Sequence, residues 1–307
     1  MHSKAKNLIV ILGPTGVGKS SIAVRLSKKL GGEIINCDSM QVYKGFDVGT
    51  DKIPLKKREG IPHHLLDVAD FSTQYTAADF VDQALKAIKD VLRRKKIPII
   101  VGGTGLYLKA LLDGLFPEGK RDPELRQKLE KEAQEKGLES LRAKLMEVDP
   151  ASCQKIHDND KVRIIRALEI FLSTQKPLSQ HFLNTRSHVD DFNIIRIGLK
   201  LERQVLYKKI EKRTDKMFEK GMIREVENLL KQEVDENSPP FRALGYKNVL
   251  KFIRKEMPLE EAILLTKRDT RRYVKRQMTW FRKMEGINWF SPNDFDAVLK
   301  FIKDNLE

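Results

Sequence analysis

The chain of 307 residues is 40% hydrophobic, so it can bury a substantial core, and its composition excludes a disordered or fibrous protein. Its formal net charge of +15 makes nucleic acid the leading partner, with a basic surface that only aids solubility as the alternative. Two cysteines are too few for a disulfide framework or a four-ligand zinc site, and no apolar run is long enough to span a membrane. We therefore expect a cytoplasmic protein without membrane contact.

Strands and helices alternate through the first third of the chain. The β-prone run at 8–12 precedes a helical pattern over 20–30, which ends at two glycines. The same alternation continues with a strand at 34–36, a helix over 77–94, a strand at 97–101 and a helix over 106–112. Such alternation predicts a parallel sheet with helices on both faces.

A helical segment then interrupts this pattern. Helix starts are expected at Asp122, Asp149 and Asp160, because an aspartate side chain caps the first turn of a helix. A proline follows Asp122 and Asp149, and its missing N–H would have no partner in that first turn anyway. A strand resumes at 193–199, and further helices are expected over 202–219, 222–232, 245–255 and 258–285. We therefore predict an α/β fold with a core domain over 1–117 and 190–307 and an all-helical insertion domain over 118–189.

The loop after the first strand matches the P-loop pattern GxxxxGK[ST], so the sheet is predicted to be a P-loop parallel sheet. Backbone amides of such a loop enclose a phosphate, its lysine adds charge, and its serine can bind Mg²⁺. A glycine-rich turn without a ligand is the alternative. No acid follows the strand at 97–101, which argues against ordinary nucleotide hydrolysis. The expected phosphate-binding residues are Gly13, Pro14, Thr15, Gly16, Val17, Gly18, Lys19 and Ser20.

Two polar side chains follow other predicted strands at the same sheet edge. Asp38 comes after the strand at 34–36, where open α/β sheets bind ligands, and its carboxylate can accept a proton from a nucleophile or simply cap a turn. Thr104 follows the strand at 97–101 and can bond a phosphate or leaving-group oxygen, although a turn-forming role is the commoner one. His63 and His64 lack a third ligand at a suitable spacing, so we do not predict a metal site there.

The C-terminal helix carries eight basic residues and one acid between Lys267 and Lys283. Helical spacing places Tyr273, Gln277 and Trp280 on one face. We predict that this face packs on the sheet domain and leaves the cations for phosphates of a nucleic acid.

Four segments of the sequence together resemble the tRNA dimethylallyltransferases, also called tRNA isopentenyltransferases. They are GPTGVGKS at 13–20, DSMQVYKGFDVGT at 38–50, VGGTGLYLKALLDGL at 101–115 and KRQMTWFRK at 275–283. The second and third are far more specific to that family than the P-loop. No cysteine follows Cys153, so a zinc-finger-like extension of the eukaryotic relatives has no counterpart, and a bacterial-type enzyme is expected.

The resemblance implies a prenyltransferase that moves a dimethylallyl group from dimethylallyl diphosphate to N6 of the adenosine just 3′ of the anticodon, with Mg²⁺ on the diphosphate. Asp38 would take the N6 proton, Thr104 would support the leaving diphosphate, and Arg213 would reach it from a C-terminal helix. The insertion would close over the anticodon arm. No obligate protein partner is indicated. Residues implied in tRNA binding are Asp38, Ser39, Met40, Gln41, Arg126, Arg163, Arg166, Arg242, Lys247, Lys275 and Arg276.

Three other functions fit parts of the pattern. A P-loop kinase of a small molecule or nucleoside would use the same loop with Asp38 as base, but it leaves the basic C-terminal helix unexplained. A prenyltransferase acting on a free adenine nucleotide is the second alternative, and its chemistry is close to that of the tRNA prenyltransferase that the resemblance implies. A nucleotide-gated RNA-binding protein without covalent chemistry is the third.

Overall fold

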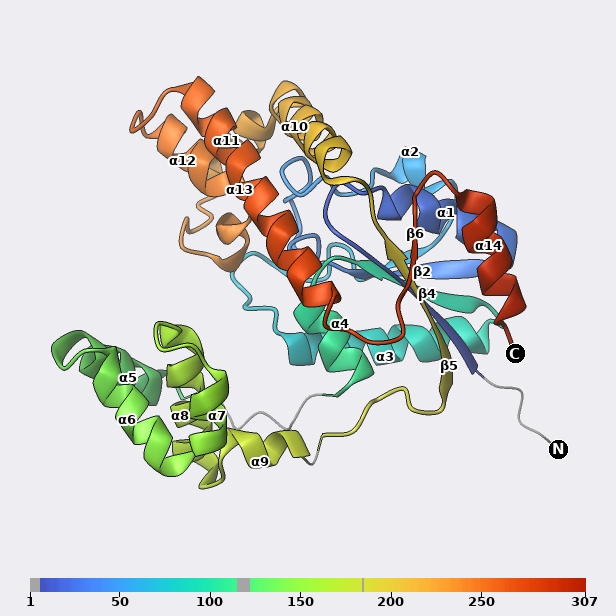
Figure 1. Cartoon of the computed structure of the whole chain (residues 1–307). Coiled ribbons are helices and arrows are strands. Elements are labelled where there is room, and N and C mark those ends of the chain that lie inside the picture. The colour runs from blue at the N-terminus through green and yellow to red at the C-terminus, as the bar shows by residue number, and fades with distance from the viewer. Residues whose placement is uncertain (1–5, 115–121, 184) are drawn as a thin grey trace. The chain divides into compact units, whose positions relative to one another are not determined.

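A computed structural model of the chain describes residues 6–114, 122–183 and 185–307 (Figure 1). The chain divides into two compact units. The first, which we call the core unit, comprises Met1–Ala110 and Asp191–Glu307, and the second, the insertion unit, comprises Leu111–Asp190. No helix among the described residues combines the length and the apolar character needed to cross a membrane.

The core unit is built on one six-stranded sheet in which all strand pairs are parallel. The strand order is β3-β2-β4-β1-β5-β6. Residues Leu8 to Leu12 are fully buried, because helices cover both faces and apolar side chains therefore suit every position of a central strand. The strands are β1 (Lys6–Leu12), β2 (Gly32–Cys37), β3 (His63–His64), β4 (Ile97–Gly102), β5 (Phe192–Leu199) and β6 (Asn288–Phe290).

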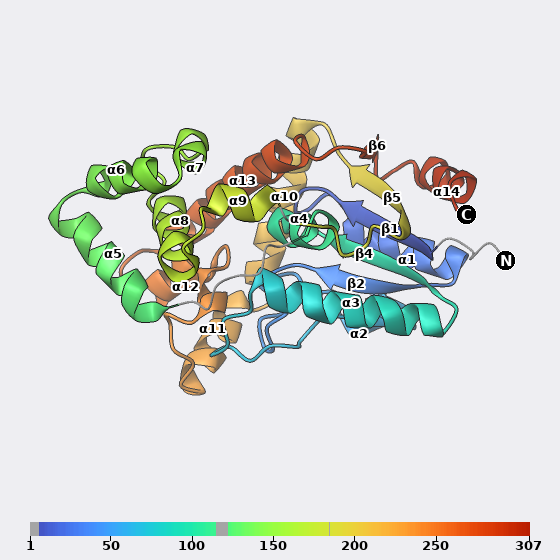
Figure 2. The ribbon, with the colours of Figure 1, turned by 90° about the horizontal axis from the view of Figure 1, so that it is seen from below.

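Helices cover both faces of the sheet, as Figures 1 and 2 show. On one face α1 (Lys19–Leu30) and α14 (Phe295–Asp304) pack with Ile9, Ile11 and Val101 in a common apolar cluster. On the other face lie α3 (Ala77–Arg93) and α4 (Gly105–Leu112). The prediction of an α/β fold with a flanked parallel sheet is confirmed.

A helical layer follows β5 and lies at the carboxyl end of the sheet (Figure 1). Contacts join α10 to α13, α11 to α12, and α12 to α13. The short α2 (Leu55–Arg58) precedes β3. The elements of the layer are α10 (Arg203–Glu219), α11 (Met222–Lys231), the 3₁₀ turn η1 (Pro239–Arg242), α12 (Tyr246–Ile253) and α13 (Leu259–Phe281).

Helices are the only regular secondary structure among the described residues of the insertion unit, which has its own apolar core that includes Leu141, Leu145 and Ile164. Each expected aspartate cap is present: Asp122, Asp149 and Asp160 accept hydrogen bonds from the first-turn amides of α5, α7 and α8. These caps satisfy donors that the helix itself leaves unpaired. The helices are α5 (Pro123–Glu135), α6 (Leu138–Val148), α7 (Pro150–Lys155), α8 (Lys161–Thr174) and α9 (Leu178–Leu183).

Candidate active site

Three neighbouring strands end at the same level of the sheet, and each is followed by a segment carrying polar side chains. The register pairs Leu12 of β1 and Cys37 of β2 with Gly102 of β4. The P-loop, Asp38 and Thr104 therefore emerge side by side at the carboxyl edge. A Cβ atom on Gly102 would lie 1.9 Å from the Cys37 carbonyl oxygen, so only glycine permits this close approach of β4 to β2.

The P-loop connects β1 to α1 in the geometry its sequence predicts. Gly13 has φ of 146°, and a Cβ atom there would lie 2.6 Å from the Leu199 carbonyl oxygen, so glycine is required for steric and conformational reasons. The Lys19 ammonium donates to the carbonyl oxygens of Gly13 and Pro14, each at 2.9 Å. Ser20 is exposed in the first turn of α1. The Lys19 side chain and the N-terminus of α1 therefore both lie at the P-loop.

Arg213 of α10 reaches this loop from the helical layer. Its guanidinium donates to the Thr15 hydroxyl at 2.6 Å, to Asp51 Oδ2 at 2.7 Å and to the Thr50 carbonyl oxygen at 3.3 Å. The carboxylate and the carbonyl orient the guanidinium toward the P-loop. Arg213 therefore contacts the P-loop, and its expected role in diphosphate binding stays a prediction.

Gln277 of α13 joins the P-loop to the turn after β4. Its side-chain oxygen accepts from the Thr15 amide at 2.9 Å, and its nitrogen donates to the Gly103 carbonyl at 2.8 Å. The sequence placed Gln277 on the packing face of this helix but gave it no role of its own. A glutamine between two aromatic residues on a packing face is a usable signal, because a buried amide needs partners for its polar atoms.

Asp38 and Thr104 are hydrogen-bonded within the loop that follows β2. Oδ1 of Asp38 accepts from the amides of Met40 and Gln41, at 2.9 and 3.4 Å, so the residue does cap a turn. The Thr104 hydroxyl oxygen accepts from the Ser39 amide at 3.0 Å. These bonds use one carboxylate oxygen and one lone pair of the hydroxyl. The second oxygen of Asp38 has no hydrogen bond within the described part of the chain, and the Thr104 hydroxyl donates to the Ser39 hydroxyl oxygen at 3.4 Å.

A cavity of about 690 Å³ in the core unit is lined by P-loop residues and by Asp38, whereas Thr104 is not among its lining residues. Its lining includes Lys19, Asp38 and Arg213, and counts eight basic side chains against three carboxylates. Lys209, Lys212 and Lys216 continue the basic wall along α10, whereas Glu211 and Asp215 of the same helix pair with α13. This row was not predicted from the sequence, although its lysines stand three and four residues apart on one helix face. The cavity suits a small polyanion.

Burial lowers the pKa of Lys19 to about 8, and Arg213 adds to this shift while the carboxylate of Asp38 opposes it. A bound phosphate chain would offset the cost of burying the ammonium group. The side chain is therefore suited to an anionic ligand, because such a ligand supplies the missing negative charge.

The donor set also fits Mg²⁺ bound together with a phosphate chain. Mg²⁺ in such sites keeps few protein ligands and completes its shell with phosphate oxygens and water. Ser20 lies on the cavity wall and offers one hydroxyl. Among the described residues no group of three or more His, Cys, Asp or Glu side chains could hold a metal alone. His64 instead contacts Glu33 at 2.7 Å, and His63 contacts the Ile61 carbonyl at 2.8 Å.

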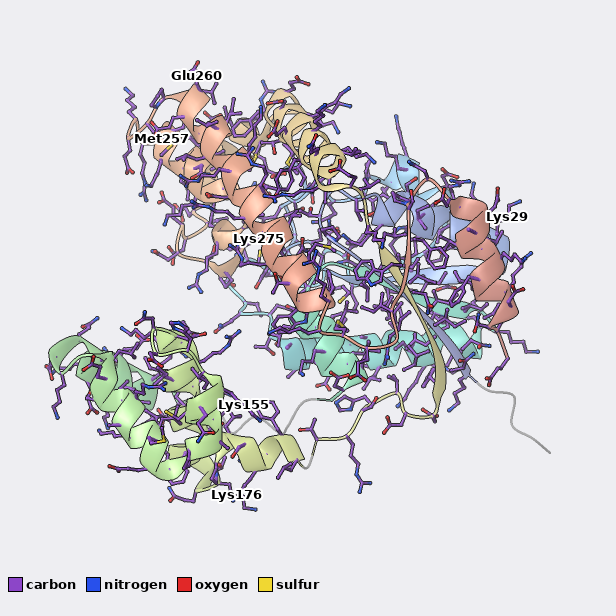
Figure 3. All side chains as sticks on the ribbon, viewed as in Figure 1. Lys29, Lys155, Lys176, Met257, Glu260 and Lys275 are labelled. Carbon is purple, nitrogen blue, oxygen red and sulfur yellow. The ribbon has the colours of Figure 1, made fainter. Side chains whose placement is uncertain are left out.

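The residues expected to bind tRNA fall into separate groups. Ser39, Met40 and Gln41 are half-buried beside Asp38, and the Gln41 amide donates to the Thr50 carbonyl. On the helical layer, Arg242 of η1 and Lys247 of α12 are exposed, as are Lys275 and Arg276 of α13. Figure 3 shows Lys275 on α13.

The three arginines expected from the insertion lie on its helices α5 and α8. Arg126 and Arg166 both contact Glu169, and Arg126 also pairs with Glu130. Arg163 pairs with its helix cap, Asp160. All three therefore already have carboxylate partners within the insertion unit.

One expectation about α13 needs correction. The sequence suggested that its cations are left for phosphates, but Lys267 pairs with Asp215 at 2.5 Å and Arg271 with Glu211 at 2.6 Å. Acids of α10 face this part of α13, so the two helices bind each other through these pairs. Lys275 and Arg276 have no such partner in the described residues, so they are among the cations of this stretch available to a polyanion.

The fold and the site together define a P-loop α/β protein. The family model described as IPP transferase matches residues 41–284. The chain is 46% identical to a tRNA dimethylallyltransferase of Acetivibrio thermocellus, over 97% of this chain and 96% of the relative, and 46% identical to one of Carboxydothermus hydrogenoformans, over 93% and 92%. The chain belongs to the IPP transferase family.

Solved structures agree with this assignment. The full-length tRNA isopentenylpyrophosphate transferase of Bacillus halodurans is 38% identical, with a TM-score of 0.73 and coverage of 98% of this chain and 97% of that one. A eukaryotic dimethylallyltransferase acting on tRNA is 32% identical, with a TM-score of 0.84 and coverage of 98% and 80%. The family members are prenyltransferases, as the sequence resemblance predicted.

Proposed function

We propose that this protein transfers a dimethylallyl group from dimethylallyl diphosphate to N6 of the adenosine 3′ of the anticodon in tRNA. The observation that carries the proposal is the convergence of the P-loop and Asp38 on a cavity with a strongly basic wall, with Thr104 at the same sheet edge. Relatives named for this reaction match nearly the whole chain.

The P-loop and Arg213 would hold the donor's diphosphate. Backbone amides at the start of α1, the Lys19 ammonium and the Arg213 guanidinium supply charge complementary to it. Ser20 would hold Mg²⁺, which neutralises the charge that develops on the departing diphosphate. Thr104 would donate its hydroxyl proton to an oxygen of that group.

Asp38 would act as the general base. The N6 lone pair of adenine is delocalised into the ring, so removal of the N6 proton makes this amine a better nucleophile. As the bond from N6 to the allylic carbon forms, the bond from that carbon to the diphosphate oxygen breaks, and the proton passes to Asp38. The carboxylate stands at the cavity while its Oδ1 keeps the turn in place.

The acceptor would approach from the exposed cations of the helical layer. The adenine must leave its stack to reach the cavity, at a cost of about a few kcal/mol that backbone contacts elsewhere offset. Lys275 and Arg276 lie on the same helix as Gln277, which contacts the P-loop. We propose that the insertion unit closes over the anticodon arm and adds contacts through Arg126, Arg163 and Arg166.

Replacing Lys275 and Arg276 with alanine is expected to weaken tRNA binding and to lower the slope of its salt dependence by about one unit per lost phosphate contact. Titrations at several salt concentrations measure this slope. The matched control replaces Lys300 and Lys303 on α14, two exposed lysines outside the proposed surface, and should leave it unchanged. Equal affinity and slope in the α13 variant would exclude this helix as the RNA surface.

Diphosphate binding should become sensitive to pH near the pKa of Lys19, which is about 8 in the free protein. The bound anion favours the protonated lysine, so binding takes up a proton above that pH, and affinity falls by up to about tenfold per pH unit. Calorimetry of inorganic diphosphate at pH 8.5, in two buffers with different ionisation heats, measures the uptake. Lys19→Arg stays charged and controls for titration of the ligand itself; equal uptake in both proteins would contradict the role of Lys19.

Release of inorganic diphosphate tests the choice of acceptor. With dimethylallyl diphosphate and Mg²⁺, we expect release that depends on tRNA and does not occur when AMP or ATP replaces it. Release with a free nucleotide would instead favour the nucleotide prenyltransferase. Consumption of the γ-phosphate of ATP with a nucleoside acceptor would favour the kinase.

A further inference from the structure

The carboxylate of Glu225, in the first turn of α11, binds the loop that leads from Asp38 to the cavity wall. Its Oε2 accepts from the amides of Asp47 at 2.9 Å and Val48 at 2.6 Å. Its Oε1 accepts from the Gly49 amide at 3.1 Å and from the Tyr246 hydroxyl at 2.6 Å. One side chain thus satisfies three consecutive backbone donors and a phenol, which fixes this stretch of loop against the helical layer.

Packing reinforces the contact. Tyr246 is fully buried, and a Cβ atom on Gly49 would lie 2.6 Å from its ring, so the loop backbone rests directly on the aromatic face. Phe46 packs against the same ring at 5.2 Å. Burial, together with the nearby Glu225, raises the pKa of Tyr246 well above its usual value, so the phenol remains a donor.

The residues just after this stretch orient Arg213. The Thr50 carbonyl accepts from the Arg213 guanidinium, as does Asp51 Oδ2. Arg213 in turn donates to the Thr15 hydroxyl in the P-loop. Hydrogen bonds from Glu225 to residues 47–49, and from Arg213 to residues 50–51 and Thr15, are therefore joined through the backbone of this loop.

We propose that Glu225 is a positioning residue for the diphosphate donor, and that it acts by holding the loop that orients Arg213. This role rests on the proposed function, in which Arg213 binds the diphosphate. The loop residues 47–49 and Tyr246 then build this support together with Glu225. Glu225 itself is not among the residues that line the proposed donor cavity.

A double-mutant cycle with inorganic diphosphate and Mg²⁺ tests the proposal by calorimetry on the full chain. In Glu225→Gln the amide nitrogen replaces one acceptor with a donor that opposes the loop amides, so we expect affinity to fall about tenfold. Arg213→Ala should lose at least as much. Because Glu225 acts through Arg213, the double variant should bind no more weakly than Arg213→Ala alone.

The control is Glu227→Gln, which removes the same charge from an exposed position of α11 and should leave diphosphate affinity unchanged. Tyr246→Phe keeps the ring but removes one donor to Glu225, so we expect a loss of about threefold that also disappears when Arg213 is alanine. This variant decides the question if Glu225→Gln does not fold. Affinity for tRNA should be unaffected in both.

The outcomes separate the two claims. Losses that multiply in the double variants, or unchanged affinity in Glu225→Gln, would overturn the role of Glu225 while leaving the proposed function intact. No binding of diphosphate by the unaltered protein would contradict the proposed function and this role with it.

Discussion

Asp38→Asn is expected to lower turnover by about 10²-fold or more, the effect typical of a removed general base. Asparagine keeps the oxygen that accepts from the amides of Met40 and Gln41, so the turn after β2 should persist. Donor affinity should therefore change little. Single-turnover rates with saturating tRNA and dimethylallyl diphosphate measure the effect on the chemical step.

The control for this variant is Asp70→Asn, which removes an exposed carboxylate that pairs with Lys44 and does not line the cavity. Its turnover should match that of the unaltered protein. A near-normal rate in Asp38→Asn would show that Asp38 only caps the turn, and another group would then have to take the N6 proton.

Lys19→Ala is expected to weaken binding of the diphosphate donor on the order of a hundredfold, because a buried charge-assisted contact to phosphate is lost. Affinity for tRNA should stay nearly intact, since Lys19 faces the P-loop carbonyls and the cavity. Separate titrations with inorganic diphosphate and with tRNA measure the two affinities.

Lys29→Ala provides the matched control on the same helix, because Lys29 is exposed in the last turn of α1 (Figure 3). Both affinities should be unchanged in that variant. A parallel loss of tRNA binding in Lys19→Ala would refute the division of the site into a phosphate half and an RNA half.

Much of the fold could be predicted because its central elements carry strong local signals. The apolar run of β1 and the 3.6-residue period of α1 are visible without tertiary information. The insertion helices begin at aspartate caps, which are local too. The short strands β3 and β6 were missed, because two or three residues show no period and pair only with partners distant in sequence.

The helix α14 was also missed, although Phe295, Val298 and Ile302 are spaced at helical intervals and are all buried. This signal was present in the sequence. The expected C-terminal helix over 258–285 ends at Phe281, just before a segment that leads into β6. Helix ends are weakly encoded when, as here, no glycine or proline follows at once.

Part of the candidate site could likewise be predicted from the sequence, and part of it could not. The P-loop, Asp38 and Thr104 could be placed together because each follows a predicted strand, and parallel strands bring their carboxyl ends to one edge. The contacts that Gln277 and Glu225 make with loops at the sheet edge could not be predicted, since these loop residues lie 174 or more residues away in the chain. Only the folded helical layer brings these groups to the loops they hold.

The mass of tRNA after incubation with dimethylallyl diphosphate and Mg²⁺ tests the proposed transfer itself. We expect an increment of one C₅H₈ unit, located by nuclease digestion and tandem mass spectrometry on the adenosine 3′ of the anticodon. The increment should be absent when Asp38→Asn is assayed on the same timescale. An unchanged mass, in a preparation that binds both inorganic diphosphate and tRNA, would contradict the proposed transfer.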